Sequence, residues 1–203
     1  IHQPERDELI LQVRTPSGTH RLLLSANASH PRVHLTQIVR ENPMTPPMLC
    51  MLMRKHFQGN KILKVSQNGY DRILRIETEG RNEMGDICRR DIVIEIMGRH
   101  SNIILLDENN KIMDSAKHVD FTVSAVRQIL PGLFYDAPPA QEKLAPDDFS
   151  LLDLMTTLDK LPEDTLLDKF LLSSFTGMSP LLAREMVYRF CQNTKTTRKE
   201  VNT

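Results

Sequence analysis

Five short extended segments separated by turn residues occupy residues 61–115, and this pattern constrains the fold more than any other feature. The segments are predicted at 61–66, 73–78, 91–97, 102–107 and 111–115. Each mixes apolar with polar residues, and Gly-, Asn- or Asp-containing turns separate them. Strands at such short spacing favour an antiparallel sandwich or barrel.

A hairpin and one short helix are expected before these segments. Residues 8–14 and 20–25 flank the turn-rich Thr15-Pro16-Ser17-Gly18, which brings the expected strands to seven. Pro46-Pro47 stops extended structure, and apolar residues then recur at helical spacing through residues 48–57. Gly59-Asn60 suits a left-handed helix end.

The pattern changes between residues 136 and 148, where a domain boundary is expected because prolines punctuate a segment without periodicity. Helices are expected at 149–158, 163–173 and 180–191, after acidic, Pro or Ser residues suited to helix starts. The turn at 175–180 has the outline of a helix–turn–helix or helix–hairpin–helix, although an ordinary helical hairpin is commoner. Residues 193–203 are expected to fray or to lead into further chain.

Composition restricts the class of protein. The chain has 203 residues, of which 40% are hydrophobic and 26% charged, as in a soluble globular protein with a real core. Its three cysteines are far apart, which fits a reducing cytoplasm better than a disulfide framework. No run reaches the ~18 apolar residues of a membrane span. The first residues resemble neither a signal peptide nor a natural start, so we expect the chain to begin inside a longer protein.

Charge is unevenly distributed although the formal net charge is zero. Residues 1–75 carry eleven Lys and Arg against five Asp and Glu, whereas residues 136–169 carry three against nine. Such a gradient can orient a protein on a phosphate backbone, although solvated faces are the commoner explanation. Aromatic residues make up only 5%, which argues against a stacking surface for single-stranded nucleic acid.

Two polar clusters interrupt the predicted strands. In the first, Gly98 permits unusual backbone geometry, Arg99 offers a planar fork for phosphate, and His100 adds a donor. A well-bonded hairpin tip is the simpler interpretation. Glu95 lies in an otherwise apolar strand, so it requires a partner such as an Arg or backbone donors unless its side faces water.

The second cluster begins with an Asn-Gly turn and continues through Tyr70, Asp71 and Arg72. Neighbouring strand residues point to opposite faces, so Asp71 and Arg72 each need a separate partner. Taken alone, this segment favours a structural role somewhat over RNA contact.

Other chemistry finds little support. His30 and His34 have the spacing of one helical face, but Pro31 lies between them and no acidic or Cys ligand completes a metal site. We therefore assign no metal and no cofactor. A nucleophile-elbow motif and a phosphate-binding Walker loop are both missing, which disfavours hydrolases and nucleotide-hydrolysing enzymes.

Several segments, in their order along the chain, resemble the NFACT-N domain of the bacterial fibronectin-binding and ribosome quality control family. They are Leu24-Ser25-Ala26, Arg32-Val33-His34-Leu35-Thr36, Pro46-Pro47, Cys50 to His56, Tyr70-Asp71-Arg72-Ile73-Leu74, Glu95 to Asn102, Leu130-Pro131-Gly132, Pro138-Pro139 and Gly177 to Glu185. Each is modest by itself, whereas together they are highly specific and cover essentially the whole chain.

The resemblance implies an α+β fold similar to the N-terminal domain of formamidopyrimidine-DNA glycosylase. It implies an antiparallel β-sandwich with short helices over residues 1–140, followed by a helix–hairpin–helix module over residues 146–203. The family's start, with its Asp-Gly motif, and its coiled coil are expected outside this sequence. A glycosylase or lyase activity is suggested only by analogy of fold, which says little about activity.

The resemblance also implies a cytoplasmic module that binds tRNA and the large ribosomal subunit holding peptidyl-tRNA. It would recruit alanyl-tRNA for untemplated tailing of stalled chains and catalyse nothing by itself. The family's Asp-Arg motif assigns tRNA binding to Asp71 and Arg72, with Arg72 on phosphate and Asp71 positioning a basic group or accepting hydrogen bonds; Arg99, His100 and Asn102 are secondary candidates. The alternative is an adhesin that binds fibronectin or fibrinogen after non-classical exposure at the cell surface.

Overall fold

The chain forms two compact units in a computed structural model that describes residues 1–139 and 142–201. The first unit contains residues 1–68 and 72–138, and the second contains residues 69–71 together with those from 139 onward. Whether these units match the family domains expected at 1–140 and 146–203 stays a prediction.

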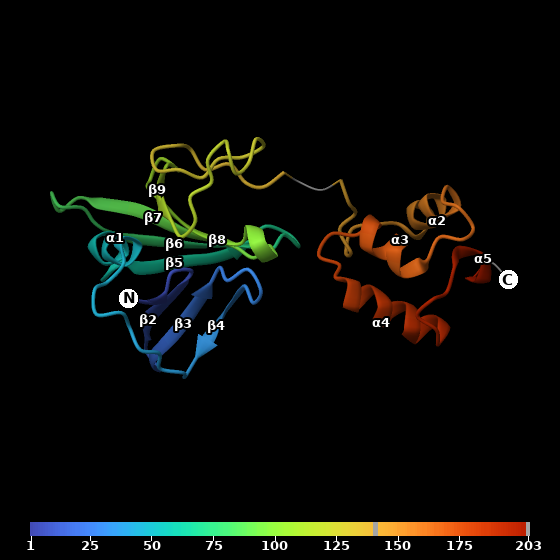
Figure 1. The fold of residues 1–203 in the computed structure, drawn as a ribbon, viewed down its shortest axis with the longest axis horizontal. Coiled ribbons are helices and arrows are strands. Elements are labelled where there is room, and N and C mark those ends of the chain that lie inside the picture. The colour runs from blue at the N-terminus through green and yellow to red at the C-terminus, as the bar shows by residue number, and fades with distance from the viewer. Residues whose placement is uncertain (140–141, 202–203) are drawn as a thin grey trace. The chain divides into compact units, whose positions relative to one another are not determined.

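The first unit contains two antiparallel sheets with a helix between them in sequence (Figure 1). The first sheet has the order β1(His2–Glu5), β2(Glu8–Thr15), β3(Gly18–Ser25), β4(Arg32–Thr36). Helix α1(Met48–Phe57) leads to the second sheet, ordered β5(Lys61–Gln67), β6(Ile73–Arg81), β7(Ile87–Glu95), β8(Asn102–Leu106), β9(Ile112–Ser115). The short 3-10 helix η1(Gly98–His100) joins β7 to β8. The predicted α+β class and antiparallel sheets are confirmed.

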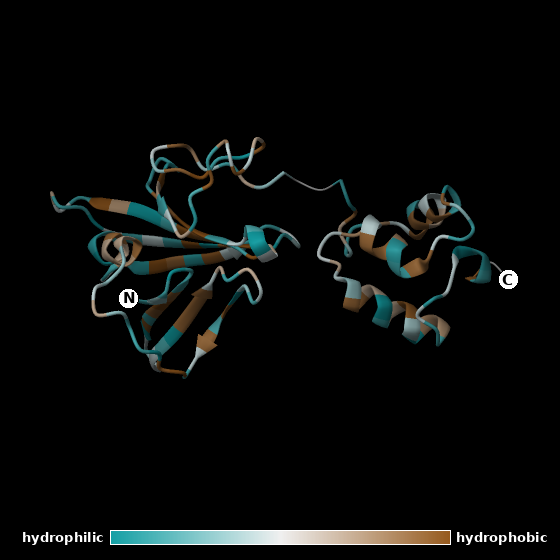
Figure 2. Ribbon diagram, in the orientation of Figure 1, coloured by the Kyte–Doolittle hydropathy of each residue, from teal (hydrophilic) through white to brown (hydrophobic). Residues whose placement is uncertain are grey.

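One hydrophobic core joins both sheets and α1. Figure 2 shows hydrophobic and hydrophilic residues mixed along the strands, as expected where one face of a strand is buried. The core side chains come from every layer: Leu9, Leu11 and Leu24 from the first sheet, Leu49, Met53 and Phe57 from α1, and Ile76, Ile92, Ile94, Ile103 and Leu105 from the second sheet. This shared burial fixes the two sheets against the helix.

The second sheet buries its other face as well. A segment that we call the strap, residues 116–138, covers Val93, Ile104, Leu106 and Ile112 with its own Ile129. Burial on both faces explains why β8, Asn-Ile-Ile-Leu-Leu, is apolar almost throughout instead of alternating. The strap thereby also encloses the polar residues that share this face.

The described part of the chain contains nine strands, not the seven expected from the sequence. The two additional strands, β1 and β4, form the edges of the first sheet. β1 has only four residues and contains Pro4, which an edge position tolerates. β4 places His34 in a strand, so the helical spacing of His30 and His34 has no structural meaning. β7 begins at Ile87, four residues before the expected start at residue 91, because a longer hairpin with β6 pairs Arg81 with Ile87.

Helix α1 has the expected ends. Pro47 precedes its first residue, and Gly59 has a φ of 83° just after the C-cap Gln58. Strand β5 follows and is the outer strand of its sheet. Its pairing with β6 shifts register between Ile62 and Lys64, which marks a β-bulge.

The second unit is helical, with α2(Leu151–Asp159), α3(Leu167–Ser174), α4(Pro180–Cys191) and α5(Arg198–Val201). Ser150 and Ser179 cap α2 and α4 by accepting hydrogen bonds from Asp153 N and Leu182 N, both at 3.1 Å. The second helix starts at Leu167, four residues later than the expected start at 163. The second unit has a small apolar core, formed by the buried side chains of Phe170, Phe175, Ala183 and Val187.

The expectation that residues 193–203 fray is wrong for the part that the structure describes. Leu167 N donates to Thr196 O at 3.0 Å and Arg198 N donates to Thr165 O at 2.9 Å, so the segment pairs with the start of α3. Residues 202–203 lie outside the described residues. None of the described helices is long and apolar enough to cross a membrane.

Candidate nucleic-acid interface

Four segments that carry basic residues meet at one end of the first unit, which we call the basic end. Ile96 N donates to Arg72 O at 2.8 Å, which joins the start of β6 to the segment before η1. A Cβ placed on Gly98 would lie 4.0 Å from Ala28 O, which brings η1 beside the loop between β3 and β4. The Lys117 ammonium donates to Ala26 O at 2.6 Å, which adds the start of the strap.

The basic end is defined by Arg32, Arg72, Arg99, His100 and Lys117. The structure thus brings together three of the sequence-predicted residues, Arg72, Arg99 and His100, and adds two that the sequence did not single out. Burial, partly offset by the charge of Asp7, lowers the pKa of the Lys117 ammonium. No spacing motif pointed to Lys117, because hydrogen bonds that depend on the fold bring it to this end.

The turn η1 presents two polar side chains from a fixed backbone. Gly98 adopts a φ of 56°, a conformation that favours glycine. The buried Ser101 Oγ accepts from Met97 N at 2.8 Å and closes the turn. Arg99 and His100 are exposed, and Arg99 Nε donates to His100 Nε2 at 3.0 Å. His100 Nε2 is the acceptor in this contact, and Nδ1 is the second nitrogen of the ring.

Asn102 has an internal position. Its side chain is only 1% exposed; Nδ2 donates to Lys117 O at 2.7 Å, and Oδ1 accepts from Lys117 N at 3.0 Å. This pair of bonds ties β8 to the strap beside Lys117. The predicted contact of the Asn102 side chain with tRNA would require this site to open. In the structure the Asn102 side chain positions the strap.

Asp71 and Arg72 are both exposed, yet they belong to different units. Arg72 begins the first unit's second segment, and its carbonyl is fixed by the bond from Ile96 N. Asp71 groups with the second unit. Both residues precede β6, which begins at Ile73, so the alternation of strand faces does not apply to them, and the expectation of separate partners stays a prediction.

A buried ion pair lies directly behind the basic end. Glu95 is 1% exposed, and the Arg127 guanidinium binds it with NH1 at 2.9 Å from Oε2 and NH2 at 2.6 Å from Oε1. Tyr135 also donates its hydroxyl to Oε1 at 2.9 Å. The expectation that Glu95, if buried, needs a partner such as an arginine or backbone donors is confirmed. The sequence did not indicate which residue, because Arg127 lies on the strap. Register places Glu95 opposite Ile73 and Asn102.

This environment changes the titration of both partners. Burial, then the Glu95 charge and hydrogen bond, raise the pKa of the Tyr135 phenol well above its ordinary value of 10.0. Burial alone would lower the pKa of Arg127, but its bonds with Glu95 outweigh this and raise it. Arg127 therefore stays a guanidinium and Tyr135 a neutral phenol throughout the neutral pH range.

We expect Tyr135→Phe to destabilise the first unit by about 2 kcal/mol, because the Glu95 carboxylate loses a charge-assisted hydrogen bond. The folded state holds the phenol proton more tightly than the unfolded state, so this stabilisation is present below pH 10 and is lost as the pH rises further. Urea unfolding at neutral and alkaline pH tests both points. An identical alkaline loss of stability in wild type and Tyr135→Phe would contradict them.

A second buried carboxylate lies under the β3–β4 side of the basic end. Glu8 accepts from Ser25 Oγ at 3.0 Å, and Arg32 NH2 lies 3.3 Å from Glu8 Oε1. Arg40 NH1 lies 2.8 Å from Oε2, where the contact is an ion pair without hydrogen-bond alignment. Glu8 is 4% exposed, so two arginines surround one hidden negative charge. Two acidic residues near this end, Glu8 and Glu95, are thus covered and matched internally, Glu8 in part by Arg32 of the basic end itself. Arg72 and Arg99 are its exposed guanidinium groups.

Within the described residues, no cluster of three or more His, Cys, Asp or Glu side chains could hold a metal ion. Cys50 and Cys88 are buried as free thiols, and Cys191 is partly buried. The described residues of the basic end supply hydrogen-bond donors and positive charge, which suit the binding of anions.

The fold and the site together define the class of protein: it has a two-sheet α+β unit with a basic end, followed in sequence by a small helical unit. The family described as NFACT N-terminal and middle domains matches residues 1–203. Rqc2 homolog RqcH from Bacillus subtilis is 45% identical over 190 residues, which are 93% of this chain and 33% of the relative. Archaeal Rqc2 homolog aRqcH from Methanocaldococcus jannaschii is 30% identical over 146 residues, which cover 72% of this chain and 20% of that protein.

Two solved structures have the same fold. The N-terminal domain of fibronectin-binding protein PavA from Streptococcus pneumoniae superimposes with a TM-score of 0.84 at 38% identity, covering 94% of this chain and 71% of that one. The fibrinogen binding protein from Staphylococcus aureus superimposes with a TM-score of 0.81 at 34% identity, covering 98% of this chain and 69% of that one. The chain belongs to the NFACT-N family, the ribosome quality control family that its motifs indicated. It spans about a third of the length of the Bacillus relative.

Proposed function

We propose that this chain is the part of a ribosome quality control factor that binds tRNA and the large ribosomal subunit holding peptidyl-tRNA. In this proposal it recruits alanyl-tRNA for untemplated tailing of stalled chains, acts in the cytoplasm and catalyses nothing by itself. The observation that carries the proposal is the basic end, in which family-motif residue Arg72 joins four other basic side chains. Family membership supplies the biological setting.

Each residue has a role suited to its surroundings. Arg72 and Arg99 offer exposed guanidinium forks that match phosphate oxygens, and His100 offers one further proton. Asp71 would be repelled by phosphate, so it accepts hydrogen bonds from a base or ribose, or positions a basic group. Asn102 holds the strap and Lys117 in place.

The helical unit has a proposed role of its own. We propose that α3, the Gly177 turn and α4 act as a helix–hairpin–helix module, and that the first unit shares its architecture with the N-terminal domain of formamidopyrimidine-DNA glycosylase. Gly177 has a φ of 70°, which gives the tight turn such a module needs. Because Ser179 Oγ already bonds Leu182 N, the available α4 backbone donors are those beside the cap.

Arg72→Ala and Arg99→Ala should each weaken tRNA binding about tenfold, because each removes a charged hydrogen-bonding contact with phosphate. The slope of log affinity against log salt should fall by about one per variant. Asp71→Ala should also weaken binding, with little change in salt slope. Binding of the purified protein to a tRNA pool at two salt concentrations measures these effects.

Arg14→Ala is the matched control, because Arg14 is an exposed strand arginine near the β2–β3 turn, at the opposite end of β2 and β3 from Ala26. It should leave tRNA affinity nearly unchanged. Equal losses in Arg14→Ala and Arg72→Ala would mean that general charge, not the basic end, carries the binding. Unchanged affinity in both Asp71→Ala and Arg72→Ala would remove those residues from the site.

The alternative function is binding of fibronectin or fibrinogen, with the protein exposed at the cell surface. One observation favours it: β5 is an edge strand with exposed Leu63 and Val65, which could pair with an extended peptide. The names of the similar solved structures point the same way. Titration of the same protein with fibronectin distinguishes the two proposals, because edge pairing should be insensitive to Arg72→Ala and weakly dependent on salt.

A further inference from the structure

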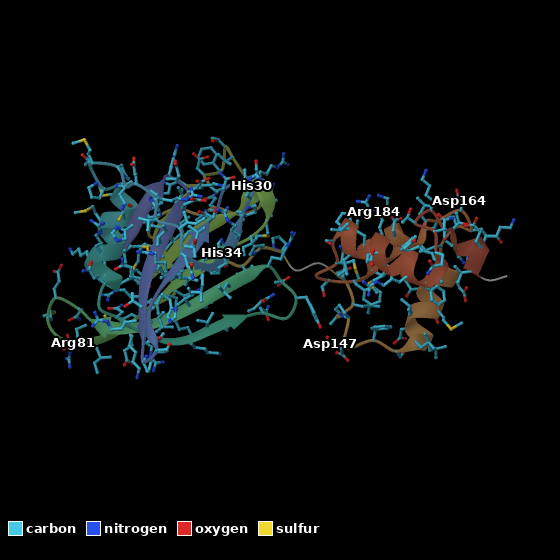
Figure 3. All side chains as sticks on the ribbon, turned by 90° about the horizontal axis from the view of Figure 1, so that it is seen from below. His30, His34, Arg81, Asp147, Asp164 and Arg184 are labelled. Atoms are coloured by element: carbon cyan, nitrogen blue, oxygen red, sulfur yellow. The ribbon has the colours of Figure 1, made fainter. Side chains whose placement is uncertain are left out.

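A polar pocket opens at the end of the first unit opposite the basic end. It has a volume of about 480 Å³ and lies between the C-terminal end of α1, the start of β5, the end of β6 and the start of β7. Figure 3 labels Arg81, which lines the pocket, and His30, which belongs to the β3–β4 loop of the basic end; they lie at opposite ends of this unit. The proposed function does not use this pocket.

The pocket lining is predominantly basic. Lys55, Lys61 and Arg81 contribute positive charges, while Glu79 is the acidic side chain of the lining. Glu79 is the cross-strand neighbour of Lys61, and Arg89 Nε lies 3.9 Å from its carboxylate, so its charge is largely matched. Lys55 Nζ forms an ion pair at 2.8 Å with Glu83 Oε1, which does not line the pocket, and both side chains are mostly exposed. A ligand phosphate could therefore compete for Lys55 at little cost.

Two side chains cover the negative end of α1 beside the pocket. The last helical carbonyls would repel an anion, but His56 O accepts from Asn60 Nδ2 at 3.0 Å and from Arg90 NH1 at 3.2 Å. His56 is affected by the same surroundings. Burial, followed by the positive charges of Arg90 and Lys55, lowers the pKa of its ring, although the charge of Glu83 acts in the other direction.

The pocket floor is shaped by a glycine in the middle of paired strand. A Cβ on Gly80 would meet Asn60 Oδ1 at 1.9 Å, so the Asn60 amide lies flat against β6 only because residue 80 has no side chain. Asn60 Nδ2 also donates to Thr78 Oγ1 at 3.2 Å, which fixes the amide in this position. The floor is thus held open by packing and by hydrogen bonds.

The lining also restricts what kind of ligand fits. Ile87 is the one large apolar side chain among the lining residues, and the lining contains no Phe, Tyr or Trp. A nucleobase would have no ring on which to stack. The long Lys and Arg side chains of the lining, together with its backbone and side-chain amide groups, suit phosphate oxygens instead.

We propose that this pocket binds a backbone phosphate of RNA and gives the first unit a second phosphate contact at the far end of β6 from Arg72. The proposal rests on the proposed function, since it assumes that RNA is the ligand of this unit. Arg72 precedes β6 and Arg81 ends it. The nine residues of β6 separate the two contacts by about 30 Å, so an RNA that reaches both must be folded or extended over that distance.

The test compares two double variants of the protein. Lys61→Gln/Arg81→Gln removes two lining cations, whereas Arg14→Gln/Lys64→Gln removes two exposed cations of the first unit that do not line the pocket. The slope of log affinity against log salt should fall by about 0.7–0.9 in the pocket variant, because that is the contribution of one phosphate contact. The control variant should lose less than half as much. If the two variants lose the same amount of salt slope, or if neither loses any, the proposal that the pocket binds phosphate is wrong.

A second measurement separates this proposal from the proposed function. Inorganic phosphate should shift the amide resonances of Gly59, Asn60 and Gly80 in the wild type and leave them unshifted in the pocket variant. If wild type binds no tRNA yet these shifts appear and saturate, the proposed function fails while the phosphate site stands. If tRNA binds through the basic end but phosphate shifts none of these amides, the pocket proposal fails alone.

Discussion

Arg127→Ala is expected to destabilise the first unit by about 3–5 kcal/mol, the largest effect of any single change considered. The substitution leaves Glu95 buried without its countercharge, which is the costly way to break a buried ion pair. Glu95 is 1% exposed and Arg127 is 14% exposed, so water cannot replace the lost guanidinium. The strap also loses its bond from Arg127 Nε to Asp136 O.

Urea unfolding followed by circular dichroism of the strands measures this loss. Arg75→Ala is the matched control, because Arg75 pairs with Asp91 on the same sheet and each member is more exposed than its counterpart: Arg75 37% against 14% for Arg127, and Asp91 14% against 1% for Glu95. It should cost less than half as much. If Arg127→Ala does not fold, the double variant Glu95→Gln/Arg127→Met still decides the matter, since removing both charges should recover most of the stability. A double variant as unstable as the single one would show that charge burial is not the cause.

Gly80→Ala should destabilise the first unit by about 2–3 kcal/mol, which is the opposite of what this substitution ordinarily does. At an extended position without positive φ, alanine normally stabilises by about 0.4–1 kcal/mol through the unfolded chain. Here the added methyl would meet Asn60 Cγ at 2.4 Å and must displace the amide. The bonds from Asn60 Nδ2 to His56 O and Thr78 Oγ1 are then lost along with the packing.

Asn60→Ala provides the appropriate background for a double-mutant cycle. In that background the methyl of Gly80→Ala has no amide to displace, so the substitution should become neutral or stabilising. Thermal unfolding of the four proteins gives the coupling free energy, which we expect to be about 2 kcal/mol. Additive effects in the cycle would show that Asn60 is not the group that excludes a side chain from position 80.

The elements that the sequence predicted well are those whose own residues decide the structure. Strands β2, β3, β5, β6 and β8 carry apolar residues bounded by turns, and α1 has both helical spacing and the glycine that follows its end. Glu95 shows how far a single residue can be interpreted. Its charge in an apolar strand required a partner, and the structure supplies Arg127.

The missed elements depend on partners that are distant in sequence. β4 is a polar edge strand that exists because Leu23 and Leu24 of β3 provide a pairing template. The end of the chain was expected to fray because its composition is polar, but Thr196 is buried against α3. Neither pairing leaves a local signal, since both are decided by long-range contacts.

The candidate site divides in the same way. Arg72, Arg99 and His100 are exposed at one end of the first unit, where binding residues belong. Asn102 is buried, and its amide holds the strap instead. The pattern Gly-Arg-His-Ser-Asn could not separate these roles, because exposure depends on strand register: Asn102 pairs with Glu95 and faces inward beside it.

The bulge in β5 has a consequence for self-association. Open sheet edges allow identical chains to join strand by strand, and the second sheet has two such edges. At β5 the register breaks between Ile62 and Lys64, and at β9 the strap closes over a four-residue strand, with Ile112 N donating to Leu133 O at 2.8 Å. Neither edge of the second sheet presents a long uninterrupted ladder, so identical chains should resist joining into continuous sheets through this sheet.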